Sequence, residues 1–197
     1  MVIEASGRRQ EIDAVAGELF HAQGYAATSV RDIARALDMQ GASLYAHVTS
    51  KEDLLWSIVD RAATAFEAGA DAALAESASG DAVDRLAALV EAHVEVVTAD
   101  PERASVFVTE WRHLSEPRRE GIARRRDDYE GRLRQLIVDG IALGAFRATD
   151  PALAATFLLT ALNGIATWFR PDGRLSADRI ADHYVDLALR SLSEDHR

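Results

Sequence analysis

The segment TSVRDIARALDMQGASLYAHVTSKEDLL, residues 28–55, decides how the amino-terminal part of the chain folds. Within it, the apolar residues Val30, Ile33 and Leu37 recur at the three- and four-residue spacing of one helical face. A second short helix is predicted over residues 42–48, after a tight turn. Two short helices joined by such a turn are the arrangement of a helix-turn-helix.

Serine residues mark two helix starts in this segment. Ser29 precedes the first short helix, and Asp32 follows three residues later, as in a variant of the capping box. Ser50 and Asp53 have the same spacing and open a longer helix. Asp38 stands at the turn, and aspartate accepts a left-handed backbone better than most residues do. The segment is therefore predicted to form helices with defined starts and a tight turn.

The second helix of a helix-turn-helix enters the major groove of DNA, so its exposed side must be small or able to form hydrogen bonds. Gln40, Gly41 and Ser43 meet this requirement. Tyr45 and His47 follow directly and can donate hydrogen bonds to phosphate. These residues are the predicted reading surface.

Lys51 is the only lysine of the chain, since the other 21 of its 22 basic residues are arginines. It lies in the first turn of the longer helix, where free backbone N–H groups and the helix dipole attract an anion. Lys51 is therefore a candidate phosphate contact. A solvated lysine at a capped helix start explains the same position equally well.

The order and spacing of Thr28 to Ala34, Leu44 with Tyr45, His47, and Ser50 with Lys51 resemble the DNA-binding signature of the TetR family of transcriptional repressors. The resemblance implies a homodimer that binds a double-stranded, palindromic operator and is controlled by a small-molecule effector. Combined with the reasoning above, it gives as DNA-binding residues Thr28, Ser29, Arg31, Gln40, Gly41, Ser43, Tyr45, His47 and Lys51.

Helical periodicity continues along the rest of the chain, and alternating strand patterns are almost absent. A first helix is marked by Ile12 to Phe20, which completes a three-helix amino-terminal domain. The breaks in periodicity predict about nine helices in all. The fold is therefore expected to be all-α, with a helix-turn-helix domain over residues 1–52 and a helical-bundle domain for effector binding and dimerisation over residues 53–197.

Composition narrows the class of protein. The net charge of −10 argues against a generally basic surface for nucleic acid and leaves room for a small local one. Cysteine is absent, which excludes disulfides and thiolate sites. The start MVIEASGRRQ has no apolar signal core, so we expect a cytoplasmic protein.

Motifs of catalysis are missing from the sequence. It contains no glycine-rich phosphate loop, no G-x-S-x-G elbow and no H-E-x-x-H. Glu110 and His113, with His93, are the best metal candidates, but two neighbouring ligands need a third and a supporting hydrogen-bond shell. We expect no enzymatic activity, no cofactor and no metal site.

The segment PALAATFLLTALNGIATWF, residues 151–169, carries no charge and approaches the length of a bilayer span. Thr156, Thr160 and Asn163 recur on one helical face, however, and such a two-sided helix is typical of a buried element in a soluble protein. We therefore expect no membrane association. The family resemblance implies that this helix and the helix over residues 176–192 form the dimer interface.

Aromatic residues and arginines of the larger domain suggest an effector site. Arginines crowd the segment from Arg118 to Arg134, and phosphate groups are recognised by arginine. The ending over residues 161–192 resembles TetR members that control lipid or sterol degradation and sense acyl-CoA thioesters. The predicted effector-binding residues are Phe107, Trp111, Tyr129, Arg125, Phe157, Asn163, Trp168 and Arg170.

Two alternatives stay open. The arginines can be a solvated helical face paired with acidic neighbours, in which case the effector is an uncharged aromatic or drug-like molecule. The second alternative is a helical adaptor whose helix-turn-helix binds another protein. Binding to DNA with an affinity that depends on salt would separate an adaptor from a regulator.

Overall fold

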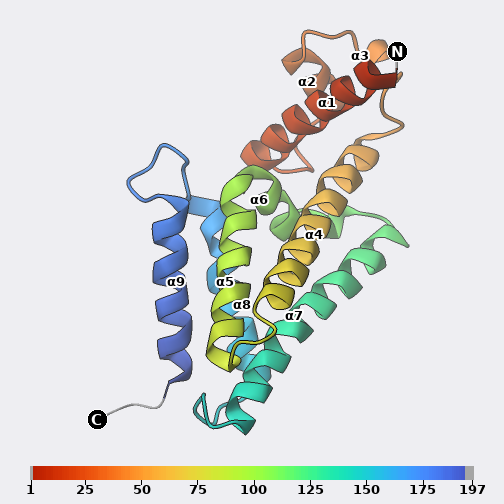
Figure 1. Cartoon of the computed structure of the whole chain (residues 1–197). Helices are drawn as coiled ribbons and strands as arrows, with labels where there is room; N and C mark the ends of the chain where they lie inside the picture. The colour runs from red at the N-terminus through yellow and green to blue at the C-terminus, as the bar shows by residue number, and fades with distance from the viewer. Residues whose placement is uncertain (1, 194–197) are drawn as a thin grey trace. The chain divides into compact units, whose positions relative to one another are not determined.

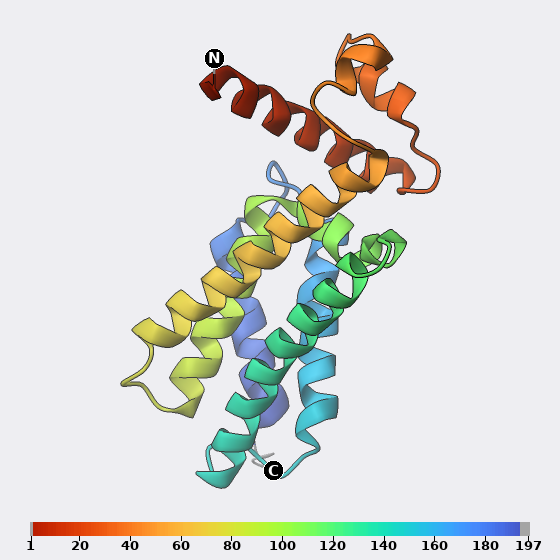
Figure 2. The same ribbon diagram turned by 90° about the vertical axis from the view of Figure 1, so that its right-hand side faces the viewer.

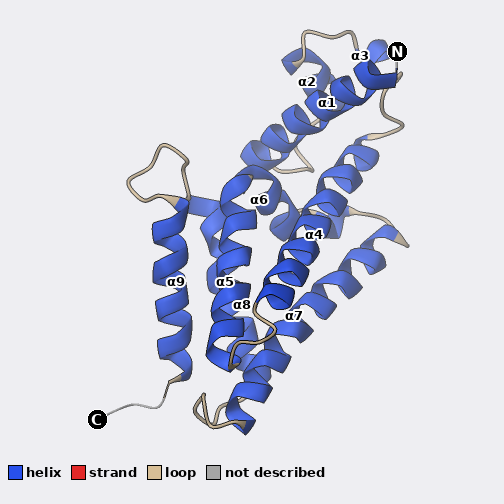
Figure 3. Cartoon of the chain, in the orientation of Figure 1, coloured by secondary structure: helices blue, strands red, loops and turns tan. Residues whose placement is uncertain are grey.

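The structure is a computed structural model that describes residues 2–193, with side chains from residue 7 onward. All regular elements of this part are helical (Figure 3), which confirms the predicted all-α class and the expected number of helices. The elements are α1 (Val2–Gln23), α2 (Val30–Ala36), α3 (Gly41–Leu44), α4 (Lys51–Glu76), α5 (Ala82–Ala99), α6 (Pro101–Thr109), the 3₁₀ helix η1 (Trp111–His113), α7 (Arg118–Ala142), α8 (Pro151–Trp168) and α9 (Ala177–Leu192).

The chain forms two compact units. Residues 1–63 and 102–123 form the first, here called the head unit, and residues 64–101 and 124–197 form the second, the bundle unit. Segment 102–123, which includes most of α6 and the start of α7, therefore packs with the head although it is distant in sequence. The predicted functional boundary after residue 52 stays a prediction, since the units divide the chain by contacts and not by function.

The head unit is built as its local motifs predict. The Ser29 hydroxyl accepts a hydrogen bond from the backbone N–H of Asp32 at 3.2 Å, and the Asp32 carboxylate accepts one from the backbone N–H of Ser29 at 3.0 Å. This completes the capping box at the start of α2. Asp38 adopts a φ of 52°, the left-handed backbone expected at the turn before α3. Phe20, Ile33 and other apolar residues are fully buried beneath these helices.

The bundle unit is organised around α5. Helix α9 lies alongside α5 in both views of the chain (Figures 1 and 2), and α8 also packs against α5. The contact faces are apolar and buried, with Leu86 and Val94 on α5, Leu158 and Ile165 on α8, and Ile180 on α9. The unit is therefore held together chiefly by the burial of aliphatic side chains.

Helix α8 begins as the sequence predicts and then departs from a fully buried helix. The Asp150 carboxylate accepts hydrogen bonds from the backbone N–H groups of Ala152 and Leu153 at 2.9 and 3.1 Å, and Pro151 stands at the first helical position. By length and apolar composition alone α8 can cross a membrane, yet only 28% of it is buried within the structure. One face of α8 packs on the bundle and the other is open.

Candidate DNA-binding and effector sites

Helix α3 presents a polar edge above a buried anchor. Leu44 is completely buried in the head unit, while Gln40 and Ser43 are exposed. The Gln40 side chain makes no capping hydrogen bond although it stands at the N-cap position of α3. Tyr45, at the end of α3, is 57% exposed. These groups are exposed, and their contact with base edges and phosphates stays a prediction.

Lys51 occupies a more enclosed place than the sequence predicts. Its ammonium group donates hydrogen bonds to the backbone carbonyls of Tyr25 and Thr28, both at 2.8 Å. It also lies 4.0 Å from the centroid of the Tyr25 ring, within the range of a cation–π interaction. A lysine ammonium has three N–H donors, and two of them bind carbonyls of the loop between α1 and α2. Lys51 thus fixes this loop to the start of α4.

Thr28 requires a correction. Its side chain is only 1% exposed, and its hydroxyl donates to the backbone carbonyl of Gly24 at 3.0 Å. The side chain therefore stabilises the loop before α2 and does not present itself to DNA. Ser29 and Arg31 are exposed, although the Ser29 hydroxyl is also engaged with Asp32 in the capping box. A sequence motif cannot show whether a threonine or serine stabilises a loop or is exposed for contact with DNA, because the surrounding helices determine its burial.

The segment after α6 is connected to the same loop. The backbone N–H of Tyr25 donates to a Glu110 carboxylate oxygen at 3.1 Å, and the Tyr25 ring stacks on His113 with centroids 5.3 Å apart. The His113 Nε2 lies 3.5 Å from the same Glu110 oxygen. Glu110 and His113, which the sequence offered only as weak metal candidates, thus hold the loop between α1 and α2 in the head unit.

A second connection joins the start of α4 to the segment before α7. Glu52 accepts hydrogen bonds from the backbone N–H and the hydroxyl of Ser115, at 3.2 and 2.7 Å. The Ser115 hydroxyl bond and the nearby Arg118 charge keep the pKa of Glu52 below its ordinary value, although partial burial opposes this. Burial, followed by the negative charge of Glu52, raises the pKa of Tyr25. Glu52 is therefore held as an anion next to the loop.

Arginines of the head unit also bind groups within that unit. Arg9 donates to the Asp13 carboxylate at 2.9 Å and to the backbone carbonyl of His47 at 3.2 Å. Arg118 lies within 3.5 Å of Asp53 and over the Trp56 ring. The His47 side chain is half-exposed, beside the carbonyl that Arg9 holds. These charged side chains thus hold α1, the end of α3 and the start of α4 together.

The predicted effector residues are divided between the two units. Phe107 and Trp111 belong to the head unit, whereas Arg125, Tyr129, Phe157, Asn163, Trp168 and Arg170 belong to the bundle unit. Within the bundle, Phe157 is 61% exposed and Trp168 is 46% exposed, while Tyr129 is buried. Phe157 and Trp168 thus lie on the surface of the bundle and Tyr129 in its interior, and their part in effector binding stays a prediction. Helical spacing gives the face of a residue, but not which face turns inward.

Arg125 has partners of its own. Its Nε and Nη2 atoms donate to the two Glu67 carboxylate oxygens, both at 2.6 Å, and Nη2 also donates to the Thr64 hydroxyl at 2.9 Å. Arg170 is exposed, and its Nη1 lies 3.4 Å from the carbonyl of Phe169. A bidentate arginine–carboxylate pair has little positive charge left for a phosphate. This favours the reading in which Arg125 is structural.

A buried polar cluster lies between three helices of the bundle unit. His93 of α5 is buried, and its Nδ1 lies 3.0 Å from the hydroxyl of Tyr129 on α7. The ring of Phe66 on α4 packs against the imidazole with centroids 4.8 Å apart. Burial lowers the pKa of His93 to about 3 and raises that of Tyr129. His93 is therefore neutral at physiological pH.

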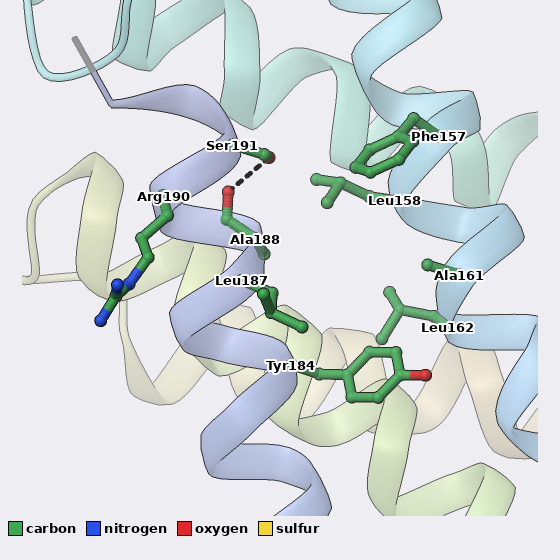
Figure 4. Close-up of a pocket in the computed structure, with 9 residues that line it drawn as sticks. All are labelled: Phe157, Leu158, Ala161, Leu162, Tyr184, Leu187, Ala188, Arg190 and Ser191. Carbon is green, nitrogen blue, oxygen red and sulfur yellow. Dashed lines mark hydrogen bonds between the residues drawn. The ribbon is translucent and has the colours of Figure 1, made fainter. Parts of the chain in front are cut away.

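An apolar groove runs along the open faces of α8 and α9. Figure 4 shows Phe157, Leu158 and Leu162 of α8 pointing toward Tyr184 and Leu187 of α9. The groove has a volume of about 440 Å³, and Leu187 is 61% exposed at its edge. Exposed apolar surface of this kind marks an interaction site. Among the described residues, no group of three or more acidic, histidine or cysteine side chains is arranged to hold a metal ion.

The buried anchor and exposed polar edge of α3, on a capped helix-turn-helix, define a DNA-binding protein of the helix-turn-helix class. Residues 12–58 match the family model for bacterial regulatory proteins of the tetR family, and residues 79–192 match that for the tetracyclin repressor-like C-terminal domain. The chain belongs to the TetR family. The resemblance that the sequence suggested is thereby confirmed.

Individual relatives support the same placement. The chain is 33% identical over 202 residues to the HTH-type transcriptional repressor KstR2 of Rhodococcus jostii RHA1, covering 97% of this chain and 94% of the relative. The solved structure of the ketosteroid transcriptional regulator KstR2 of Mycobacterium tuberculosis matches with a TM-score of 0.89 at 26% identity, covering 95% and 96% of the two chains. That of AibR in complex with isovaleryl coenzyme A and operator DNA matches with a TM-score of 0.78 at 30% identity, covering 91% and 97%.

Proposed function

We propose that the protein is a transcriptional repressor that leaves a palindromic DNA operator when a small-molecule effector binds. The observation that carries the proposal is the exposed polar edge of α3, where Gln40 and Ser43 face outward over the buried Leu44. The relatives named above are a transcriptional repressor and a regulator seen with operator DNA. The function is that of a cytoplasmic regulator and not of an enzyme, and it requires no cofactor.

The proposed DNA contacts divide by chemistry. Gln40 and Ser43 contact base edges, and amide side chains suit adenine in the major groove. Tyr45 and His47 contact phosphates, and the third donor of Lys51 is available for a phosphate at the start of α4. Ser29, Arg31 and Gly41 flank this surface. Residues 1–52 then form the DNA-binding domain, and residues 53–197 receive the effector and the second protomer.

The proposed homodimer uses the open faces of α8 and α9. Leu153, Phe157, Trp168 and Leu187 are all large, apolar and exposed there, and a two-fold axis lets the same face cover itself in a second copy. A dimer also explains why α8 is uncharged yet mostly unburied in one protomer. A second protomer would cover the open face of α8, so a membrane is not required to explain it.

The proposed effector is an acyl-CoA, by analogy with the isovaleryl coenzyme A in the AibR structure. The competing effector is an uncharged aromatic or drug-like molecule. The competing class is favoured by one observation, since Arg125 is already paired with Glu67. Both classes need apolar surroundings, and we propose the aromatic cluster around His93 as part of the effector site.

Operator binding and release test the proposal together. A Gln40→Ala protein is expected to change its base preference at one position per half-site, by about 1–3 kcal/mol, while other positions keep theirs. Titration of the protein–operator complex with acyl-CoAs and the matching free acids distinguishes the effector classes. Release by thioesters at concentrations at least about tenfold lower than those of the acids supports CoA recognition. A protein that binds all DNA sequences equally, or none, would contradict the repressor function.

A further inference from the structure

We infer that His93 is the hydrogen-bond donor that recognises a carbonyl oxygen of the effector. The inference rests on the proposed effector function. It adds which chemical group of the effector the bundle unit recognises. It follows from one atom of the bundle unit: the Nε2 of His93 is buried and has no hydrogen-bond partner among the described residues.

The imidazole that carries this atom packs with two other aromatic rings. Tyr129 holds the other ring nitrogen of His93 at 3.0 Å and meets the imidazole edge-on, with ring centroids 5.6 Å apart. Phe66 packs against the imidazole and also meets Tyr129 edge-on, with centroids 5.9 Å apart. The three rings come from α4, α5 and α7, so the imidazole is oriented from several sides. A polar atom fixed in this way cannot turn to find another partner.

The tautomer of His93 follows from counting hydrogen-bond donors. If the Tyr129 hydroxyl donates to Nδ1, then Nε2 carries the ring proton and one donor is left without an acceptor. If Nδ1 carries the proton and donates to the hydroxyl, then Nε2 and the hydroxyl proton are both left unsatisfied. The first arrangement leaves fewer unsatisfied groups and is the favoured one. His93 therefore presents an N–H donor at Nε2.

The partner of this donor is an uncharged acceptor. A buried unsatisfied donor is costly, and native interiors keep few of them. The imidazole is neutral in its apolar surroundings, so it offers no charge to offset the desolvation of a carboxylate. Arg132, whose positive charge acts against the rise in the pKa of Tyr129, is itself paired with Asp71 at 2.6 Å. A ketone, ester or thioester oxygen fits these conditions, whereas a free acid or an amine does not.

A matched pair of probes tests the inference on the full-length protein. Isovaleryl-CoA and its thioether analogue, in which a CH₂ group replaces the carbonyl, differ only at the proposed contact. Calorimetry on the wild-type protein is expected to show the thioester binding about tenfold tighter, the effect of one otherwise unmade buried hydrogen bond. In His93→Phe this ratio falls to about one. In His93→Gln, whose side-chain amide restores an N–H donor near the Nε2 position, the ratio recovers in part.

An uncharged pair separates this inference from the choice of acyl-CoA. The pair is 4-phenyl-2-butanone and butylbenzene, which differ by the carbonyl oxygen and share the aromatic ring and the four-carbon chain. If CoA compounds do not bind but the wild type prefers the ketone and His93→Phe does not, the acyl-CoA proposal fails and the inference stands. If the wild type discriminates within neither pair, or if His93→Phe keeps the discrimination, the inference is overturned.

Discussion

The head unit and the bundle unit differ in the kind of surface that they leave exposed. In the head, Lys51, Arg9 and Glu110 are bound to backbone groups or to opposite charges, so most polar groups serve the internal geometry. In the bundle, one buried polar atom of His93 has no partner, and the α8–α9 face leaves Phe157 and Leu187 exposed. Among its described residues, the head also keeps a buried side-chain nitrogen without a hydrogen-bond partner, Nδ1 of His21, so the clearest difference between the units is the open apolar face of the bundle. The predictions below test this difference, from the largest expected effect to the smallest.

The largest effect is expected at the open apolar face. Leu187→Asp places a carboxylate in the proposed dimer interface, where an unpaired buried charge costs several kcal/mol, so the dimer dissociation constant should rise by about a hundredfold or more. Because Leu187 is 61% exposed in one protomer, the protomer itself should stay folded. Sedimentation and circular dichroism measure both quantities.

The control for this experiment is Leu143→Asp, which changes a 76% exposed leucine directly after α7, outside the α8–α9 face. It should leave the dimer intact. A wild-type protein that is monomeric at micromolar concentration would contradict the interface, as would a Leu187→Asp protein that dimerises normally.

Lys51→Ala should weaken the head from within. It removes two hydrogen bonds to the loop carbonyls and the contact with the Tyr25 ring, so the free energy of unfolding should fall by about 2 kcal/mol. Operator affinity should fall for all sequences alike, because the loop precedes the reading helices. Denaturant unfolding and DNA titrations at several salt concentrations check both effects.

The salt dependence separates the two roles of this lysine. If Lys51 also contacts a phosphate, its loss lowers the salt slope by about one unit, whereas an internal role alone leaves the slope unchanged. Arg35→Ala is the stability control, because Arg35 is exposed and pairs with Asp32 in a surface bridge, which contributes about 0–1 kcal/mol. Unchanged stability in Lys51→Ala would contradict the role of Lys51 in the loop.

His93 should make the stability of the bundle sensitive to acid. Its pKa is 6.5 in an unfolded chain and about 3 in the folded protein, so the unfolded state binds the proton first as pH falls. Stability is therefore independent of this group above its unfolded pKa and decreases below it. Between pH 7 and 5 the loss attributable to His93 should be about 2 kcal/mol at most.

His93→Phe should remove this part of the pH dependence while retaining an apolar ring. His183→Phe, which removes an exposed imidazole on α9, is the matched control and should leave the dependence as in the wild type. Denaturant unfolding at pH 7, 6 and 5 gives the slopes. Equal slopes for wild type and His93→Phe would mean that the imidazole is protonated as easily in the folded protein as in the unfolded chain.

The smallest effect is expected at Arg125. Because this arginine is paired with Glu67 and Thr64, Arg125→Gln should lower stability by about 1 kcal/mol or less and leave the affinity for uncharged effectors unchanged. Calorimetry with acyl-CoAs decides whether it has a second role. A loss of acyl-CoA affinity of tenfold or more would return Arg125 to the phosphate site that the sequence predicted.

Local features of the head were determined by the sequence itself. The Ser29 capping box and the left-handed turn at Asp38 depend on neighbours only a few residues away. Interactions of this range are set by residue type and spacing, because the helix brings residues i, i+3 and i+4 together whatever surrounds them. The same locality made the family signature recognisable.

Only the tertiary structure decided which of these residues are free to act. Thr28 is buried, Lys51 binds the loop at Tyr25, and Glu110 supports that loop from a segment 85 residues further along the chain. In the bundle, periodicity placed Phe157 and Tyr129 on helical faces, but the packing of α8 turned the first outward and that of α7 turned the second inward. Burial and pairing are properties of contacts between distant segments, and a sequence pattern fixes the face of each helix without naming what covers it.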